Sequence, residues 1–297
     1  MKSKKKFFEG VCTALITPFK DDKIDFEAFA LVINNQILCG IDALCILGTT
    51  GEASTLSFDE KIEIIKFAST VVKGRIPLVF GIGGNNPNEI IKLGKAVKDI
   101  NPSAAVMLTA PYYNKCTQDA AVKYFDTVAN AVGLPMIVYN VPKRTGMNLE
   151  PGTLAKICTN PYIIGIKEAS GDMSQIIEAV HLCPVAVYSG DDGLALPCYS
   201  VGCFGVISVA SNVRPVETRA IWSCFCDLTR IVKPSYLFLK EVPYYNALFC
   251  EVNPGPVKYA AHLMGYCRPD LRLPLTQPTD KSIMTHGFRK LFKPTGN

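Results

Sequence analysis

Eight short apolar runs, each followed by a longer amphipathic segment, constrain the fold more than any other feature of the sequence. The runs are continuous rather than alternating, which is typical of parallel strands covered on both faces. They lie at residues 11–17, 43–48, 77–83, 104–110, 135–140, 163–168, 185–190 and 205–209. Eight β-then-α units in roughly 220 residues predict a (β/α)8 TIM barrel. A doubly wound sheet is the alternative, although it would normally need fewer strands.

The segments between the runs have the periodicity of amphipathic helices, as in residues 86–100 and 116–133. Residues 57–74 are a clear example, because Ser57 and Glu60 have the spacing of a capping box and Gly74 suits a helix C-terminus. We expect this helix to bury one face, formed by Ile62, Ile65, Phe67 and Val71 or Val72.

The strand pattern stops at about residue 214, and the rest of the chain has the pattern of helices. The first of these helices follows the last strand directly and completes the barrel. We therefore divide the chain into a catalytic barrel at residues 9–229 and a C-terminal helical appendage at residues 230–297. Within the appendage, residues 267–280 are rich in proline and predict a loop.

Composition argues against several classes of function. The 297 residues are 48% hydrophobic and 19% charged, with a net charge of +5. No basic stripe interleaved with aromatic residues is present, so we expect no nucleic-acid partner. No apolar stretch reaches the length of a membrane span, and the basic start of the chain lacks the apolar segment of a signal peptide. We therefore expect a soluble cytoplasmic protein that does not bind membranes.

The twelve cysteines and three histidines do not form a metal-binding pattern. The cysteines are scattered through apolar runs, where a thiol behaves as a small hydrophobic group, and no C-x-x-C motif occurs. The sequence "GIGGNN" at residues 81–86 resembles half of a dinucleotide fingerprint, but Asn86 stands where the third glycine is required. We expect reduced thiols, no metal and no cofactor.

Lys167, at the end of the sixth apolar run, is the main candidate for chemistry. Lysine is rarely buried without a partner or a function, so Lys167 is either a rim residue paired with Glu168 or another carboxylate, or a nucleophile. Strand ends meet at one mouth in such a barrel, and tyrosines and hydroxyls converge there. A lysine pointing into an apolar barrel has its ammonium form disfavoured, and its free amine can form a Schiff base with a carbonyl. We favour the nucleophile.

Other residues at the mouth have both a chemical and a structural interpretation. Thr49 and Thr50, in "GTTGE" at residues 48–52, can hold a small carboxylate or form only a tight turn. Tyr139, at the end of the fifth run, can carry protons beside Lys167 or simply pack in a strand with its hydroxyl bonded.

The loops beyond the strands add a cation and two more aromatic residues. Arg144 can clamp a substrate carboxylate with two hydrogen bonds or remain solvated. Tyr112 and Tyr113, in "APYYN" at residues 110–114, can belong to the site or to a subunit interface, where tyrosine is enriched.

Seven motifs occur in an order and spacing that identify a family. The chain resembles the 4-hydroxy-tetrahydrodipicolinate synthase (dihydrodipicolinate synthase) family, within the N-acetylneuraminate lyase superfamily of class I, Schiff-base aldolases. The resemblance runs from about residue 9 to 280, and it rests on "GTTGEASTL", "APYYN", "YNVPKRTG", "GIKEASGD", "SGDD", "GVISV" and "NPGPVK". "GIKEASGD" and "GTTGE" mark the superfamily, whereas the arginine in "YNVPKRTG" favours the synthase over its sugar-acid relatives.

The resemblance implies an activity and catalytic roles for four residues. Lys167 would form a Schiff base with pyruvate, which would then condense with L-aspartate 4-semialdehyde to give 4-hydroxy-tetrahydrodipicolinate in lysine and diaminopimelate biosynthesis. Tyr139, Thr49 and Tyr113 would form the family's proton relay, with Tyr113 reaching into the site of a neighbouring subunit.

The resemblance also implies four binding residues. Thr50 and nearby backbone would hold the carboxylate of pyruvate, and Arg144 would bind the carboxylate of the semialdehyde. Gly190 and Ile207 match positions that line the family's pocket.

Some family members are inhibited by lysine at a dimer-interface cleft. Asn85, Glu89 and Tyr112 match positions of that site, whereas Phe58 and Lys61 stand where regulated enzymes often carry histidines. A cation at position 61 would repel the ammonium groups of lysine, so we expect weak or no inhibition. The resemblance further implies a homo-oligomer, commonly a tetramer formed from two dimers.

Two other functions remain open from the sequence. The first is another pyruvate-dependent lyase of the superfamily, such as an N-acetylneuraminate or 2-keto-3-deoxy sugar acid aldolase, which shares the Schiff-base lysine and differs in its aldehyde. The second is a catalytically silent barrel that binds a small acid, against which the intact set of lysine, tyrosine and threonine argues.

Overall fold

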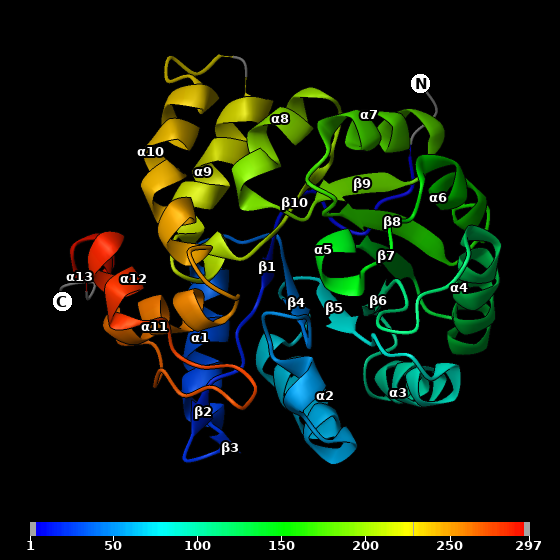
Figure 1. Cartoon of the computed structure of the whole chain (residues 1–297), viewed down its shortest axis with the longest axis horizontal. Coiled ribbons are helices and arrows are strands. Elements are labelled where there is room, and N and C mark those ends of the chain that lie inside the picture. The colour runs from blue at the N-terminus through cyan, green and yellow to red at the C-terminus, as the bar shows by residue number, and fades with distance from the viewer. Residues whose placement is uncertain (1–3, 228, 294–297) are drawn as a thin grey trace.

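The computed structural model describes residues 4–227 and 229–293. Eight parallel strands close into a barrel in the order β1–β10–β9–β8–β7–β6–β5–β4 (Figure 1). They are β1 (Gly10–Ala14), β4 (Ala43–Ile46), β5 (Leu78–Gly81), β6 (Ala105–Thr109), β7 (Met136–Asn140), β8 (Ile163–Glu168), β9 (Ala186–Ser189) and β10 (Gly205–Ser208). Each overlaps one predicted apolar run, although the strands are mostly shorter than the runs, and the predicted (β/α)8 barrel is confirmed.

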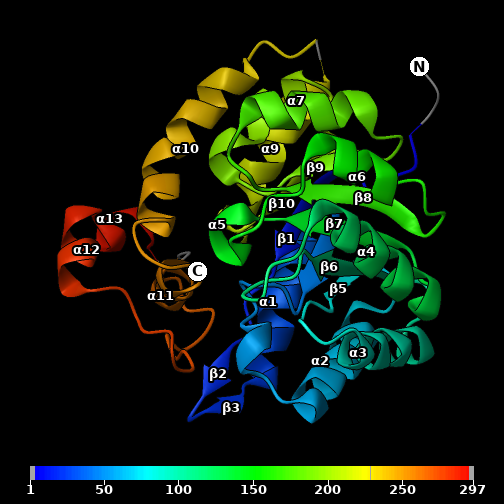
Figure 2. The ribbon, with the colours of Figure 1, turned by 45° about the vertical axis from the view of Figure 1, so that its right-hand side comes forward.

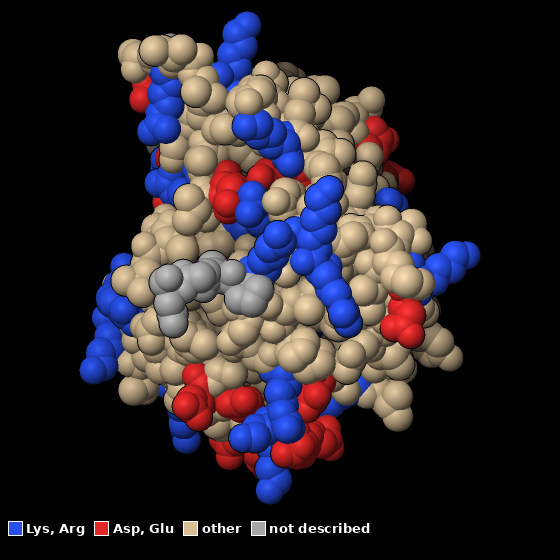
Figure 3. Space-filling view, turned by 90° about the vertical axis from the view of Figure 1, so that its left-hand side faces the viewer, with Lys and Arg blue, Asp and Glu red and all other residues tan. Residues whose placement is uncertain are grey.

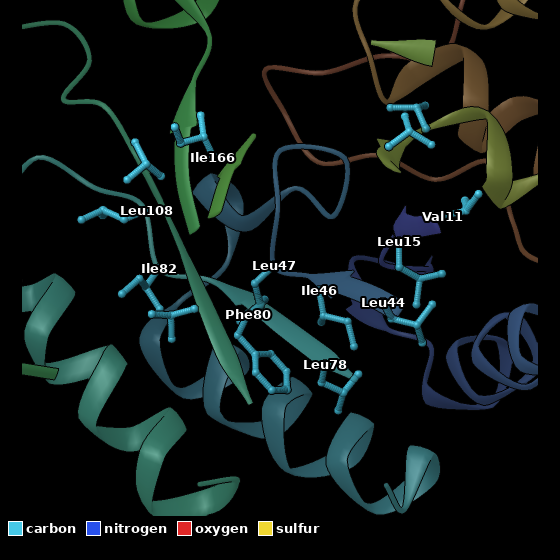
Figure 4. Close-up of a cluster of buried hydrophobic side chains, with 14 of the residues drawn as sticks. Val11, Leu15, Leu44, Ile46, Leu47, Leu78, Phe80, Ile82, Leu108 and Ile166 are labelled. Atoms are coloured by element: carbon cyan, nitrogen blue, oxygen red, sulfur yellow. The ribbon is translucent and has the colours of Figure 1, made fainter. Parts of the chain in front are cut away.

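Burial on both faces explains why the strands are continuous apolar runs. Along β4, Leu44 and Ile46 belong to the large core between the barrel and its helices, which Figure 4 shows in close-up. Ala43 and Cys45 belong to a smaller cluster inside the barrel. Alternate residues of one strand therefore fill two different apolar layers, and no position on the strand faces water.

Helices on the outside of the barrel follow the strands, as the sequence predicts (Figure 2). The longer ones are α1 (Phe26–Leu38), α2 (Phe58–Val72), α3 (Pro87–Ile100), α4 (Gln118–Val132), α6 (Pro151–Ile157), α7 (Met173–Leu182) and α9 (Pro215–Cys226). Shorter helical segments are α5 (Pro142–Thr145), α8 (Ala195–Ser200), η1 (Ala53–Thr55), η2 (Asp192–Leu194) and η3 (Ala210–Asn212).

Helix α2 shows how far local sequence determines an element. The predicted capping box between Ser57 and Glu60 is present, and the helix ends at Lys73, in a left-handed conformation, directly before Gly74. The predicted buried face is only partly correct. The helix buries Ile64, Ile65, Ala68 and Val72, whereas Ile62 and Phe67 are only partly buried at the edge of the core.

The hairpin of β2 (Phe19–Lys20) and β3 (Lys23–Ile24) was not predicted from the sequence. Each strand has two residues, which is too short to produce an apolar pattern. The turn contains Asp21 and Asp22, both with positive φ. Aspartate tolerates this conformation better than most residues, so the pair of aspartates is the local signal for the turn.

The C-terminal appendage lies at one side of the barrel (Figures 1 and 2). It consists of α10 (Pro234–Leu248), α11 (Gly255–Leu263), α12 (Asp280–Thr285) and α13 (Phe288–Leu291). Helix α10 packs along α9, and the proline-rich segment before α12 is a loop, as predicted. No helix in the described part of the chain is long and apolar enough to cross a membrane.

Phe8, just before β1, packs into the cluster inside the barrel. Its ring stacks on Tyr188 of β9 with 4.2 Å between centroids. The Tyr188 hydroxyl donates a hydrogen bond of 2.8 Å to the carbonyl of Phe8. The N-terminal segment is thereby held against Tyr188 inside the barrel.

Candidate active site

Lys167 and Tyr139 lie side by side at the carboxyl ends of two neighbouring strands. They are paired in the register of β8 with β7. Both side chains are buried, with 5% of Lys167 and 6% of Tyr139 exposed. The Lys167 Nζ lies 4.3 Å from the centroid of the Tyr139 ring. The arrangement places a buried primary amine against the ring of a buried phenol.

The alternative interpretation of Lys167 as a rim residue paired with Glu168 is wrong. Successive residues of a strand point to opposite faces, so the two side chains diverge. Glu168 is 1% exposed and accepts hydrogen bonds from neutral donors, among them Asn140 Nδ2 and the Ser170 amide. No ion pair between described residues includes Lys167.

Gly190, which follows β9, leaves the space that the lysine side chain occupies. A Cβ atom at position 190 would lie 3.1 Å from Lys167 Cε and 2.7 Å from the Cβ of Ala169. Both distances are too short for a side chain without displacement of the neighbours. Ile207 of β10 is fully buried in the same inner cluster as Tyr139. These two predicted pocket residues therefore shape the apolar surroundings of the amine.

A cavity of about 440 Å³ opens at this end of the barrel. Thr49, Tyr139 and Arg144 line it, together with the backbone-rich segment of Gly81, Ile82, Gly83 and Gly84. Its volume lies within the range of small-molecule sites in proteins. The cavity therefore joins three of the predicted site residues, whereas Lys167 lies behind Tyr139 and is not among the residues that line it.

Asn253, which precedes α11, links two of the predicted binding residues. Its Nδ2 donates a hydrogen bond of 2.9 Å to the Thr50 hydroxyl, and its carbonyl accepts one of 3.1 Å from Arg144. Thr50 and Asn253 are buried, whereas the Arg144 side chain is largely exposed. The appendage therefore contributes directly to the mouth of the barrel.

The residue that ends "GTTGE" forms a second link to the appendage. Glu52 has φ of 54°, and its fully buried carboxylate forms an ion pair with fully buried Lys258 of α11. The same carboxylate accepts a hydrogen bond of 3.1 Å from the Arg272 amide. Burial lowers the pKa of Lys258, and the charge of Glu52 acts in the opposite direction. The loop that carries Thr49 and Thr50 is thus fixed from outside the barrel.

Comparison with known proteins now adds to this geometry. The model of the dihydrodipicolinate synthetase family matches residues 7–287. The chain belongs to this family. A 4-hydroxy-tetrahydrodipicolinate synthase of Alkaliphilus oremlandii is 42% identical over 271 residues, which cover 91% of this chain and 93% of that protein.

Solved structures of this family have the same fold along nearly the whole chain. A chloride-inhibited dihydrodipicolinate synthase from Acinetobacter baumannii, complexed with pyruvate, is 37% identical with a TM-score of 0.90, covering 94% of this chain and 96% of that one. A family member from Cyanidioschyzon merolae with lysine bound is 34% identical with a TM-score of 0.88, covering 96% of this chain and 100% of that one.

Tyr113 stands apart from the other candidate residues of this dihydrodipicolinate synthetase family member. Its side chain is 88% exposed, and its backbone has φ of 65°, which is unusual for a bulky residue. The preceding Tyr112 is 39% exposed, and its amide donates a hydrogen bond of 3.2 Å to Asn85 Oδ1. Within one chain, Tyr113 therefore does not complete the buried pair of Lys167 and Tyr139.

The candidate effector positions line the same cavity. Lys61, Asn85, Glu89 and Tyr112 all belong to its lining, as does Phe58. Burial lowers the pKa of Lys61. The ammonium of Lys92 lies 4.3 Å from the centroid of the Phe58 ring, so a second cation is also close by.

Sequence reasoning missed the residues that hold the site in place. Asn253 and Lys258 lie in "NPGPVK", a motif that the resemblance includes, but their partners are about two hundred residues away. Asn140 and Glu168 directly follow the two catalytic candidates, and that adjacency was the available signal. All twelve cysteines lie in the described part of the chain, and none of them forms a disulfide.

Proposed function

We infer that the chain condenses pyruvate with L-aspartate 4-semialdehyde through a Schiff base on Lys167. The product would be 4-hydroxy-tetrahydrodipicolinate, for lysine and diaminopimelate biosynthesis. The buried amine of Lys167 against the Tyr139 ring, at the mouth of a barrel of this family, carries the proposal. The activity for which the relatives are named and the pyruvate complex of the Acinetobacter structure support both the reaction and its first substrate.

The chemistry follows from the amine and its surroundings. The free amine of Lys167 attacks the ketone of pyruvate, and loss of water gives a protonated imine. The imine withdraws electrons, so a methyl proton is lost and an enamine forms. The enamine carbon attacks the aldehyde, and the amine of the second substrate then displaces Lys167 as the ring closes. Tyr139 moves protons in these steps, with Thr49 at the cavity and Tyr113 completing the relay.

The substrates' carboxylates have separate binding groups in this proposal. Thr50, held by Asn253, and nearby backbone bind the carboxylate of pyruvate. Arg144 binds the carboxylate of the semialdehyde, because it lines the cavity and one of its nitrogen atoms is already fixed by the Asn253 carbonyl. A guanidinium held at one side still presents donors to a planar anion.

A second copy of the chain would supply Tyr113. The exposed ring and the strained backbone of this residue support that role, since such a conformation persists only where the surroundings require it. We therefore propose a homo-oligomer that contains at least a dimer through this loop, with a tetramer of two dimers as the expected form.

The test compares aldehydes in the presence of pyruvate. Pyruvate loss is followed with aspartate 4-semialdehyde and, separately, with N-acetylmannosamine or a sugar aldehyde. Loss only with the semialdehyde supports the proposal. Loss only with a sugar assigns the chain to the lyases that act on sialic or sugar acids. Borohydride with pyruvate, using Lys167→Met as control, traps the imine, and failure to trap it in the wild type would indicate a silent binding protein.

Lysine inhibition should be weak or absent. A relative in this family has lysine bound. Here Lys61 lines the cavity beside the candidate effector positions, and its charge would repel the ammonium groups of lysine. The measurement is the initial rate at increasing lysine concentration. Strong inhibition below millimolar lysine contradicts the argument, whereas Lys61→His should increase sensitivity if the argument is correct.

A further inference from the structure

The residues that follow the catalytic pair form a pair of their own. In the register of β7 with β8, Tyr139 is opposite Lys167 and Asn140 is opposite Glu168. Side chains alternate along a strand, so Asn140 and Glu168 lie on the outer face of the barrel, directly behind the two site residues. Asn140 is fully buried and Glu168 is 1% exposed. Whatever fixes this second pair also fixes the strand ends that carry the first.

Glu168 is a buried carboxylate held by neutral donors. One hydrogen of Asn140 Nδ2 is shared between its two oxygens, each 3.1 Å away. The Ser170 amide donates at 2.8 Å and Gln175 Nε2 at 3.3 Å. No ion pair between described residues includes Glu168. The Glu168 carboxylate therefore accepts hydrogen bonds from β7, from α7 and from the start of the loop that follows β8.

The donors themselves are fixed by further bonds. The other hydrogen of Asn140 Nδ2 goes to Asn148 Oδ1 at 2.9 Å, and Asn140 Oδ1 accepts from the Leu149 amide at 3.0 Å. Asn148 and Gln175 bond to each other in both directions, at 2.7 and 3.1 Å. The orientation of Asn140 is thus determined, and its Nδ2 can only point toward Glu168.

We propose that Asn140 and Glu168 form a cross-strand clamp that positions Lys167 against Tyr139 for imine chemistry. Backbone bonds set the register of two strands but leave small slides and rotations, and an error of about 1 Å in a reacting group can cost roughly 10²-fold in rate. An apolar pair would avoid the desolvation cost of a buried carboxylate. The polar pair instead specifies one geometry. The inference rests on the proposed Schiff-base role of Lys167.

The decisive experiment exchanges donor and acceptor across the strands. Asn140→Asp places two carboxylates face to face and also faces Asn148 Oδ1, whereas Glu168→Gln keeps one acceptor oxygen and places an amide nitrogen among the remaining donors. Asn140→Asp should lower kcat by about 10- to 100-fold and Glu168→Gln by less, with the KM for pyruvate changed less than about threefold in both. The double variant again places a donor opposite an acceptor across the strands, so its kcat should be clearly higher than that of Asn140→Asp.

A matched control separates positioning from stability. Gln175→Met removes the hydrogen bonds of Gln175 to Glu168 and to Asn148 but leaves the donor of Asn140 opposite Glu168. It should lower the Tm while kcat stays within about threefold of the wild type. The rate of borohydride trapping with pyruvate is measured for every variant, because it reports on Lys167 independently of the second substrate.

Each outcome decides the proposal. A wild-type kcat in Asn140→Asp, a double variant with a kcat no higher than that of Asn140→Asp, or an equal loss of kcat in Gln175→Met would each overturn the clamp. If a single variant does not fold, Asn140→Ser deletes the cross-strand bond without adding charge, and a normal kcat in that variant would also overturn it. A wild type that cannot be trapped with pyruvate refutes the proposed function itself, and the clamp's role with it.

Discussion

Two buried glutamates hold the two sides of the barrel mouth by different means. Glu52, in the loop after β4, bonds to the cation of Lys258 and to the amide of Arg272, both from the C-terminal appendage. Glu168, at the end of β8, bonds only to neutral groups from neighbouring parts of the barrel. The first joins two parts of the chain, whereas the second fixes two adjacent strands. A buried carboxylate at this mouth can therefore either join the appendage to the barrel or hold two neighbouring strands in one position.

The largest effect is expected at the β7–β8 side. Tyr139→Phe should lower kcat by about 10²–10⁴-fold, because the phenol is the proposed proton carrier and phenylalanine keeps the packing. The Tm should change little. An unchanged kcat would exclude the relay role of Tyr139, and the β7–β8 side of the mouth would then have no proposed proton carrier.

The next effect belongs to the appendage side and is one of stability. Lys258→Met leaves Glu52 as an unpaired buried charge and should lower the free energy of unfolding by about 3–5 kcal/mol, measured in urea. Glu52→Gln combined with Lys258→Met should recover most of this loss. Lys240→Met, at an exposed position of α10, is the control. A loss of unfolding free energy below about 1 kcal/mol in Lys258→Met would show that Glu52, like Glu168, does not depend on a cation.

A smaller effect is expected where the appendage meets the substrate site. Asn253→Ala removes the hydrogen bond to Thr50 and should raise the KM for pyruvate by roughly tenfold, as expected for loss of a bond worth about 1–2 kcal/mol. Asn160→Ala is the matched control, because Asn160 is equally buried but donates to Asp126 and Asn130. Equal KM values in the two variants would mean that Asn253 only packs.

The smallest effect depends on pH. Arg272, from the proline-rich loop, donates hydrogen bonds to Glu60 and lowers the pKa of that carboxyl from 4.5 to about 2. A lowered pKa stabilises the fold above pH 4.5, and the contribution is lost as the pH falls toward 2. Figure 3 shows acidic and basic side chains gathered together at the lower edge of the face that it presents. Because Glu60 is partly exposed, we expect about 1 kcal/mol.

The measurement is urea unfolding at pH 5 and pH 3. Glu60→Gln keeps the capping geometry and should lose less stability over this interval than the wild type, whereas Glu63→Gln, at an exposed position of the same helix, should behave like the wild type. The pKa of Glu168 is shifted in the opposite direction, because burial raises it. The contribution of Glu168 to stability is therefore greatest at low pH and is lost as the pH rises through the raised pKa. An equal loss of unfolding free energy between pH 5 and pH 3 in the wild type and in Glu60→Gln would contradict the proposed role of Glu60.

The sequence predicts the barrel well because each strand is a local pattern. Eight apolar runs became eight strands, since burial on both faces makes most of their positions apolar, and the polar exceptions such as Lys167 and Glu168 lie near strand ends. The capping box of α2 is equally local. The two-residue strands of the β2–β3 hairpin lie below the length at which a pattern exists, and the buried face of α2 depends on what packs against it.

The site divides in the same way. The strand-end location of Lys167 and Tyr139 could be read from the runs themselves, and their contact follows from the strand order. The ion pair between Glu52 and Lys258 joins residues 206 apart, and the bond from Asn253 to Thr50 spans 203. No local pattern encodes such partners, so only the folded chain shows what holds "GTTGE" in place.

The distance in sequence between Glu52 and Lys258 has a consequence for how the protein is made. At about 5–20 residues per second, a ribosome needs roughly 10–40 s to add the 206 residues that separate the two side chains. During that interval Glu52, in the loop that carries Thr49 and Thr50, cannot form its ion pair with Lys258. A nascent chain can therefore contain every proposed catalytic residue and still lack the ion pair that fixes the loop at the site.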